Sequence, residues 1–102
     1  MRHVYLLMYD IANPKRLRKV YRSCLGVGDP VQFSVFRCEL SKTELLLLRE
    51  RLWTIIHHTD DRVMVVELGP APRDDAPDTV SARFTCWGAP PLTTPQRGAV
   101  VV

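Results

Sequence analysis

An aspartate at the end of an apolar run is the residue of this chain best suited to chemistry. Residues 4–9 are all apolar or aromatic, and Asp10 follows them directly. A carboxylate at the end of a buried strand can act as a ligand for a hard divalent cation. One carboxylate binds such an ion weakly and is commonly only a turn residue. A two-fold dimer presents each interface residue twice, so paired copies of Asp10 would build a hydrolytic metal site.

A basic segment begins a few residues after Asp10. Its charged residues are Lys15, Arg16, Arg18, Lys19 and Arg22. No acidic residue stands three or four positions away within this segment, so we expect these charges to repel one another instead of pairing. They also crowd the start of an expected helix, where the macrodipole disfavours cations and favours phosphate. The pattern indicates polyanion binding, with an ordinary solvated helix face as the alternative.

Two other groups give weaker signals. His57 and His58 are adjacent, and neighbouring helical residues point about 100° apart, so they cannot chelate one ion together. A role at a helix C-terminus is the simpler interpretation. Phe33 and Phe36 could stack on bases, but their spacing places them on opposite faces of a strand, where core or interface packing is expected.

The apolar pattern predicts the elements that position these residues. Residues 3–9 predict a central strand, because both of its alternating faces are apolar. Asn13-Pro14 begins a helix that Gly26 ends. Residues 28–30 predict a turn, and residues 31–40 predict one long strand or two short ones joined by a tight bend. A capping box at residues 41–44 opens a second helix over about residues 42–57, and residues 62–68 predict a further strand.

Read as βαββαβ, this order predicts an α+β protein of the ferredoxin-like architecture, an antiparallel sheet with both helices on one face. Residues 1–68 form this domain. Residues 69–102 form a linker, a possible fifth strand over residues 79–87 and a proline-rich tail. Strands that are apolar on both faces need a cover on the open side of the sheet, and a second copy of the chain is the simplest one.

Charge and cysteine content narrow the function further. The 102 residues carry a net charge of +3, and residues 1–52 hold ten Lys and Arg against five Asp and Glu. A basic N-terminal half favours a polyanionic partner. Three widely spaced cysteines argue against a disulfide framework or a zinc site and fit a reducing compartment. The first apolar run is too short for a signal peptide or membrane span, so we expect a cytoplasmic protein without a membrane partner.

Three stretches of the chain together resemble a known family. Residues 7–20, 31–40 and 60–63 occur in the order and spacing of the small CRISPR-associated protein Two, the partner of the integrase in spacer acquisition during antiviral defence. The combination of Tyr9-Asp10-Ile11 with Ser34-Val35-Phe36 is fairly specific, although neither piece is specific alone. After residue 68 the chain departs from the family pattern.

The resemblance implies a homodimer packed sheet against sheet, with an extra C-terminal strand that often pairs with the partner protomer. It implies that Asp10 of each protomer meets near the axis and binds Mg²⁺ or Mn²⁺ in a metal-dependent endonuclease of RNA or DNA. The residues on its motif positions are Asp10, Tyr9, Arg16, Arg18, Ser34 and Phe36. The alternative is a non-catalytic adaptor that bridges integrase dimers and holds duplex DNA, with single-stranded RNA as a further candidate ligand.

Overall fold

A computed structural model gives the fold of the chain and describes residues 1–80, 83–92 and 100–101. The elements, in chain order, are β1 (Arg2–Asp10), α1 (Pro14–Leu25), β2 (Gly28–Gln32), β3 (Val35–Ser41), α2 (Lys42–Ile55), β4 (Arg62–Pro70), β5 (Thr85–Cys86) and β6 (Val100–Val101). The first six elements follow the predicted βαββαβ order.

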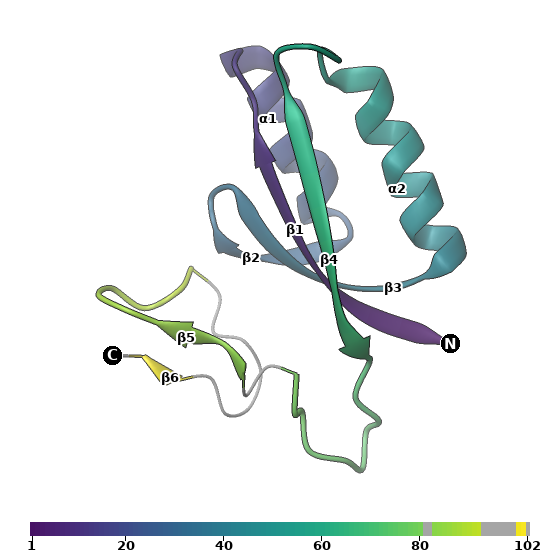
Figure 1. Cartoon of the computed structure of the whole chain (residues 1–102), viewed down its shortest axis with the longest axis vertical. Coiled ribbons are helices and arrows are strands. Elements are labelled where there is room, and N and C mark those ends of the chain that lie inside the picture. Colours follow the sequence, from purple (N-terminus) through teal and green to yellow (C-terminus); the bar gives the residue numbers. More distant parts are fainter. Residues whose placement is uncertain (81–82, 93–99, 102) are drawn as a thin grey trace.

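Four strands form one antiparallel sheet in the order β2-β3-β1-β4. Figure 1 shows α1 and α2 on the same side of this sheet. The strand β1 lies between β3 and β4, as its apolar residues on both faces predicted. The α+β ferredoxin-like architecture is confirmed.

Residues 28–41 form a hairpin whose turn lies later than the sequence indicated. The turn predicted at Gly28-Asp29-Pro30 is wrong, because these residues begin β2 and pair with β3. A proline is tolerated there because β2 is an edge strand. Gly28 is required by close approach, since a Cβ at this position would lie 2.5 Å from Cys38 Sγ. The turn falls at Phe33 and Ser34, so the alternative of two short strands is the correct one.

Both helices begin at the predicted caps. The Asn13 side chain accepts hydrogen bonds at the start of α1, and Ser41 with Glu44 forms the capping box of α2. The second helix ends two residues earlier than expected, so His57 and His58 belong to the turn that follows it.

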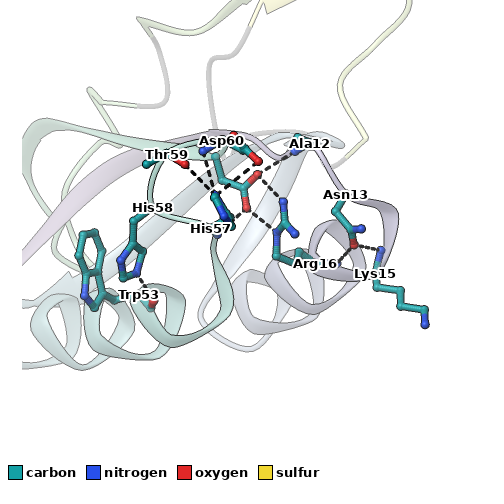
Figure 2. Close-up of polar contacts among 10 residues, drawn as sticks. Ala12, Asn13, Lys15, Arg16, Trp53, His57, His58, Thr59 and Asp60 are labelled. Carbon is teal, nitrogen blue, oxygen red and sulfur yellow. Dashed lines mark hydrogen bonds and ion pairs between the residues drawn. The ribbon is translucent and has the colours of Figure 1, made fainter.

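The two histidines make hydrogen bonds at and just after the C-terminal end of α2. His58 Nε2 lies 2.8 Å from the Trp53 carbonyl oxygen, and the imidazole stacks on the indole with ring centroids 3.7 Å apart. His57 Nδ1 accepts a hydrogen bond from Asp60 N at 3.2 Å (Figure 2). The helix C-terminal interpretation is therefore confirmed for His58.

The core lies between the helices and one face of the sheet. Tyr5, Leu7 and Tyr9 alternate along β1 toward the helices and are buried. The remaining buried members of this cluster are Val20, Cys24, Phe36, Cys38, Leu40, Leu48 and Leu52. Because Tyr9 is part of this core, the backbone that carries Asp10, the next residue, is held in place.

The other face of the sheet is partly covered by the segment that follows β4. Arg37 on this face is buried, and its guanidinium lies 3.3 Å from a carboxylate oxygen of Asp78. Val80 and Phe84 line a hollow together with Leu6 of β1. The C-terminal residues thus contact their own sheet.

Apolar side chains on this face of β1 and β4 are half-buried or exposed, Leu6 and Met8 being half-buried. Met8 pairs with Met64, and Leu6 pairs with Val66, so all four side chains share the face opposite the helices. Met64 and Val66 are 55% and 42% exposed. This set of four residues is called the open sheet face below.

Part of the C-terminal prediction lies outside the described residues. Within the strand predicted over residues 79–87, Thr85–Cys86 forms β5, which pairs in parallel with β6, while residues 81–82 are not described. Residues 93–99 and 102 of the predicted proline-rich tail also lie outside the described part. Among the described residues no helix is long and apolar enough to cross a membrane. All three cysteines are free.

Candidate acidic site and nucleic-acid interface

Asp10 stands at the C-terminal end of the central strand with its side chain exposed. Its partner across the sheet is Arg62, the first residue of β4. In the described part of the chain no hydrogen bond or ion pair engages the Asp10 carboxylate. Both of its oxygens are therefore open to a cation or to water.

A second aspartate, Asp61, fixes the segment that follows Asp10. Its side chain is 0% exposed. Oδ1 accepts hydrogen bonds from Ala12 N at 2.9 Å and Arg16 Nη2 at 3.1 Å, and Oδ2 accepts from Arg16 Nε at 2.7 Å and His57 N at 2.8 Å. The three residues that donate to it, Ala12, Arg16 and His57, are labelled in Figure 2. One carboxylate thus joins the β1–α1 turn, α1 and the α2–β4 turn.

These contacts set the ionisation of Asp61. The hydrogen bonds from Arg16 are the largest cause that holds its pKa well below the usual range, and the amides of His57 and Ala12 act in the same direction against burial. The same pairing raises the pKa of Arg16. Because four donors occupy its oxygens, Asp61 is not available as a metal ligand. The sequence pattern gave Asp61 no role of its own, because Ala12 and Arg16 lie 49 and 45 residues away from it.

The expectation that the basic residues of α1 lack acidic partners is wrong for Arg16. Its partner is 45 residues away in the sequence and therefore invisible to a rule based on helical spacing. The other four basic side chains are exposed, and no described ion pair engages them. They are Lys15, Arg18, Lys19 and Arg22.

The backbone amides at the start of α1 are already hydrogen-bonded. Asn13 Oδ1 accepts from Lys15 N at 2.9 Å and from Arg16 N at 3.1 Å, while Ala12 N donates to Asp61. The amides of Ala12, Lys15 and Arg16 are therefore not free to bind a phosphate. A phosphate on this surface would be held by side chains, through charge-assisted hydrogen bonds.

The three secondary candidates lie at the β2–β3 turn and beneath it. Tyr9 donates through its hydroxyl to the Phe33 carbonyl and through its amide to Ser34 O at 3.1 Å. Burial is the main cause that raises the pKa of Tyr9 to about 12, so the phenol stays protonated and does not act as a base at neutral pH. Phe36 is fully buried and packs in the core, whereas Ser34 is exposed at the turn.

The donor set fits a hard divalent cation only in part. The exposed Asp10 carboxylate offers the oxygen ligands that Mg²⁺ and Mn²⁺ take. Among the described residues, however, no three His, Cys, Asp or Glu side chains gather as a metal cluster. A single chain thus contributes one carboxylate, and further ligands must come from a second chain, water or phosphate oxygens.

The fold and the site define a small ferredoxin-like α+β protein with an exposed carboxylate at the end of its central strand and a basic helix beside it. The family model for the CRISPR associated protein Cas2 matches residues 1–75. The chain therefore belongs to the Cas2 family, and the resemblance noted in the sequence is confirmed.

Individual relatives agree with this placement. The chain is 41% identical over 69 residues to a "CRISPR-associated endoribonuclease Cas2 1" of Rhodospirillum rubrum, covering 68% of each chain. It is 33% identical over 99 residues to a "CRISPR-associated endoribonuclease Cas2 3" of Synechocystis sp., covering 97% of this chain and 98% of the relative. The crystal structure of Streptococcus pyogenes Cas2 is 34% identical with a TM-score of 0.59, over 62% of this chain and 82% of that chain.

The Asp61 contacts predict a specific response to acid. Because folding lowers the pKa of Asp61, this group stabilises the fold above its ordinary pKa of 3.8, and the stabilisation is lost as pH falls below that value. We expect Asp61→Asn to lower the urea midpoint of unfolding at pH 7. The asparagine NH₂ group would face N–H donors of Arg16 and the backbone, which need an acceptor. The difference from wild type should shrink progressively between about pH 4 and pH 2.

Asp60→Asn is the matched control, because Asp60 is exposed and contacts only the neighbouring His57. It should change the urea midpoint little at any pH. If the urea midpoints of wild type and Asp61→Asn differ by the same amount at every pH, the role given to this carboxylate is contradicted.

Proposed function

We propose that this chain is a metal-dependent endonuclease of nucleic acid that works as a homodimer in CRISPR spacer acquisition, with Asp10 as its catalytic and metal-binding residue. The observation that carries the proposal is the exposed Asp10 carboxylate, which no described residue engages, at the end of the central strand next to a basic helix. Membership of a family whose relatives are named endoribonucleases supports the same reaction class.

The open sheet face supports the dimer. Leu6, Met8, Met64 and Val66 form an apolar surface on the central strand and its neighbour. Exposed apolar patches of this kind mark association sites. A second copy seated on this face would bring two β1 strands, and hence two Asp10 residues, toward a common axis.

Asp10 from each protomer would hold Mg²⁺ or Mn²⁺, and the bound ion would polarise a phosphate oxygen and lower the pKa of water. The residues of this chain supply the remaining functions. The Asp61 contacts keep the turn after Asp10 fixed, and the exposed basic side chains of α1 bind the phosphates on either side of the reacting one.

A second candidate is a DNA-binding adaptor without catalysis, which bridges integrase dimers. Four basic side chains on one helix, none of them in an ion pair within the described part of the chain, favour backbone binding to duplex DNA. No His, Cys, Asp or Glu cluster accompanies Asp10 within the described residues, which leaves proton transfer to water or to a second chain. Both candidate functions, the adaptor and the nuclease, include binding to an integrase subunit.

The dimer proposal predicts that a charge on the open sheet face separates the protomers. We expect Met64→Glu to convert the dimer into a monomer in sedimentation at micromolar concentration, because the interface would bury the carboxylate. Leu47→Glu is the matched control, since Leu47 is 61% exposed on α2, away from the sheet, and should leave a dimer. A monomeric wild-type chain would remove the paired-carboxylate site.

The catalytic proposal predicts that Asp10→Asn abolishes cleavage and keeps the fold. The amide preserves the shape of the side chain and removes the charge that holds the ion. Cleavage of single-stranded RNA and duplex DNA should require Mg²⁺ or Mn²⁺ in the wild type and fall to background in the variant. Cleavage that survives in Asp10→Asn would reject the role of Asp10.

The same variant separates the two candidates in cells. An adaptor keeps spacer acquisition with Asp10→Asn, because duplex binding needs only the basic face. Loss of acquisition with intact dimer and intact DNA affinity would show that the carboxylate performs necessary chemistry.

Nucleic-acid binding should depend on the basic face of α1 and fall with salt. Each phosphate contact contributes about 0.9 to the slope of log affinity against log salt for duplex DNA. Replacing Arg18 and Lys19 with Ala should flatten this slope by up to about two units per chain. The charge-matched control is Arg49→Ala with Arg51→Ala on α2, which are also exposed. Equal effects of both pairs would mean that only net charge matters.

A further inference from the structure

An aromatic cavity lies between α1 and the β2–β3 turn. It has a volume of about 530 Å³ and is mostly apolar. Its lining residues are Tyr9, Leu17, Arg18, Tyr21, Arg22, Leu25 and Phe33. Leu17 and Leu25 of α1 border this cavity and are 40% and 46% exposed.

Phe33 forms the outer wall of the cavity. Its side chain is 73% exposed at the turn, although an exposed phenylalanine gains little from folding. The Tyr21 ring faces it, with centroids 6.4 Å apart and planes at 41°, and Tyr21 rests edge-on against the buried Phe36 at 5.5 Å. One ring thus presents an open face to solvent, backed by rings anchored in the core.

The turn that carries Phe33 is held in place. The Tyr9 hydroxyl donates to the Phe33 carbonyl, and the Tyr9 amide donates to Ser34 O at 3.1 Å. Tyr9 is itself buried, so these bonds tie the turn to the central strand. The cavity is therefore preformed, which lowers the entropic cost of binding a flat ligand there.

The rim of the cavity is cationic. Arg18 and Arg22 are one helical turn apart, exposed, and without an ion-pair partner among the described residues. A flat aromatic surface beside two guanidinium groups matches a ligand that is itself flat and carries phosphate. This charge complementarity favours a nucleotide over an apolar peptide or a second copy of the chain, whose proposed contact is the opposite face of the sheet.

We propose that this cavity binds one unpaired nucleobase of a polynucleotide, stacked on Phe33, with the adjoining phosphates on Arg18 and Arg22. The volume lies within the range of small-ligand sites. A base inside a duplex cannot enter, so the ligand is a single-stranded stretch or end. The proposal rests on the proposed function for the class of ligand, and it extends that function by giving the nucleic acid a base-binding site on the helix side of β1, where Tyr9 lines the cavity.

The test compares two oligonucleotides of equal charge. The probes are a 12-nucleotide oligothymidylate and a 12-mer of abasic sites with the same phosphates, with affinities measured by fluorescence anisotropy at fixed salt. Wild type should bind the base-bearing probe more tightly. Phe33→Ala should weaken that binding by about 5- to 140-fold, the equivalent of about 1–3 kcal/mol for one stacked base, and leave the abasic probe unchanged.

Two variants control for the chemistry of the ring. Phe33→Trp keeps a stacking surface and should retain the preference for the base-bearing probe, with its fluorescence quenched on binding. Trp87→Ala removes another aromatic side chain that is 82% exposed and outside the cavity, so both affinities should stay at wild-type values. Because Phe33 is exposed, Phe33→Ala should keep the wild-type thermal midpoint and oligomeric state.

Several outcomes would overturn the base site. They are equal weakening of both probes, no weakening of either, or the same loss in Trp87→Ala. All measurements are made in EDTA and repeated in Asp10→Asn, so they do not depend on cleavage. An inactive nuclease with an intact base preference would reject the proposed catalysis alone, whereas metal-dependent cleavage without that preference would reject the base site alone.

Discussion

The burial of one ionised carboxylate, Asp61, is the constraint on which the site depends. A buried charge is tolerated only when hydrogen bonds replace its lost hydration, and Asp61 receives two from Arg16 and two from backbone amides. Those donors come from three parts of the chain that meet only in the folded state. The arrangement therefore fixes the path of the backbone after Asp10 and the start of α1 together. It also removes one arginine from the surface charge that reaches a polyanion.

The alternation of β1 distributes two functions from neighbouring residues. Tyr9 points into the helix side, where it supports the β2–β3 turn, and Asp10 ends the strand with an exposed carboxylate. Leu6 and Met8 face the opposite side and belong to the open sheet face. Five consecutive residues of the central strand, 6–10, thus contribute side chains to the aromatic cavity, the acidic position and the proposed dimer surface. This is possible because successive side chains of a strand point to opposite faces.

The sequence predicted what depends on local pattern. Strand β1, the cap at Asn13, the capping box at Ser41 and the exposed Asp10 all follow from residue types at short spacing. Three features required the fold. The partner of Arg16 is distant in sequence, and the turn at Phe33 sits in a run of residues that reads as extended. The place of Gly28-Asp29-Pro30 in β2 depends on edge pairing with β3, which composition alone cannot distinguish from a turn.

The proposed acidic site and the proposed base site differ in how they are completed. One chain supplies a single Asp10, so the proposed paired-carboxylate site would be completed by a second copy, whereas the cavity at Phe33 is lined by residues of one chain alone. A two-fold dimer would then carry one acid pair on its axis and two base sites away from it. A strand crossing the axis would meet basic side chains from both protomers, and the ring at Phe33 would hold only nucleotides that have left the duplex. Backbone charge would set affinity for any nucleic acid, while the aromatic cavity would select for unpaired positions.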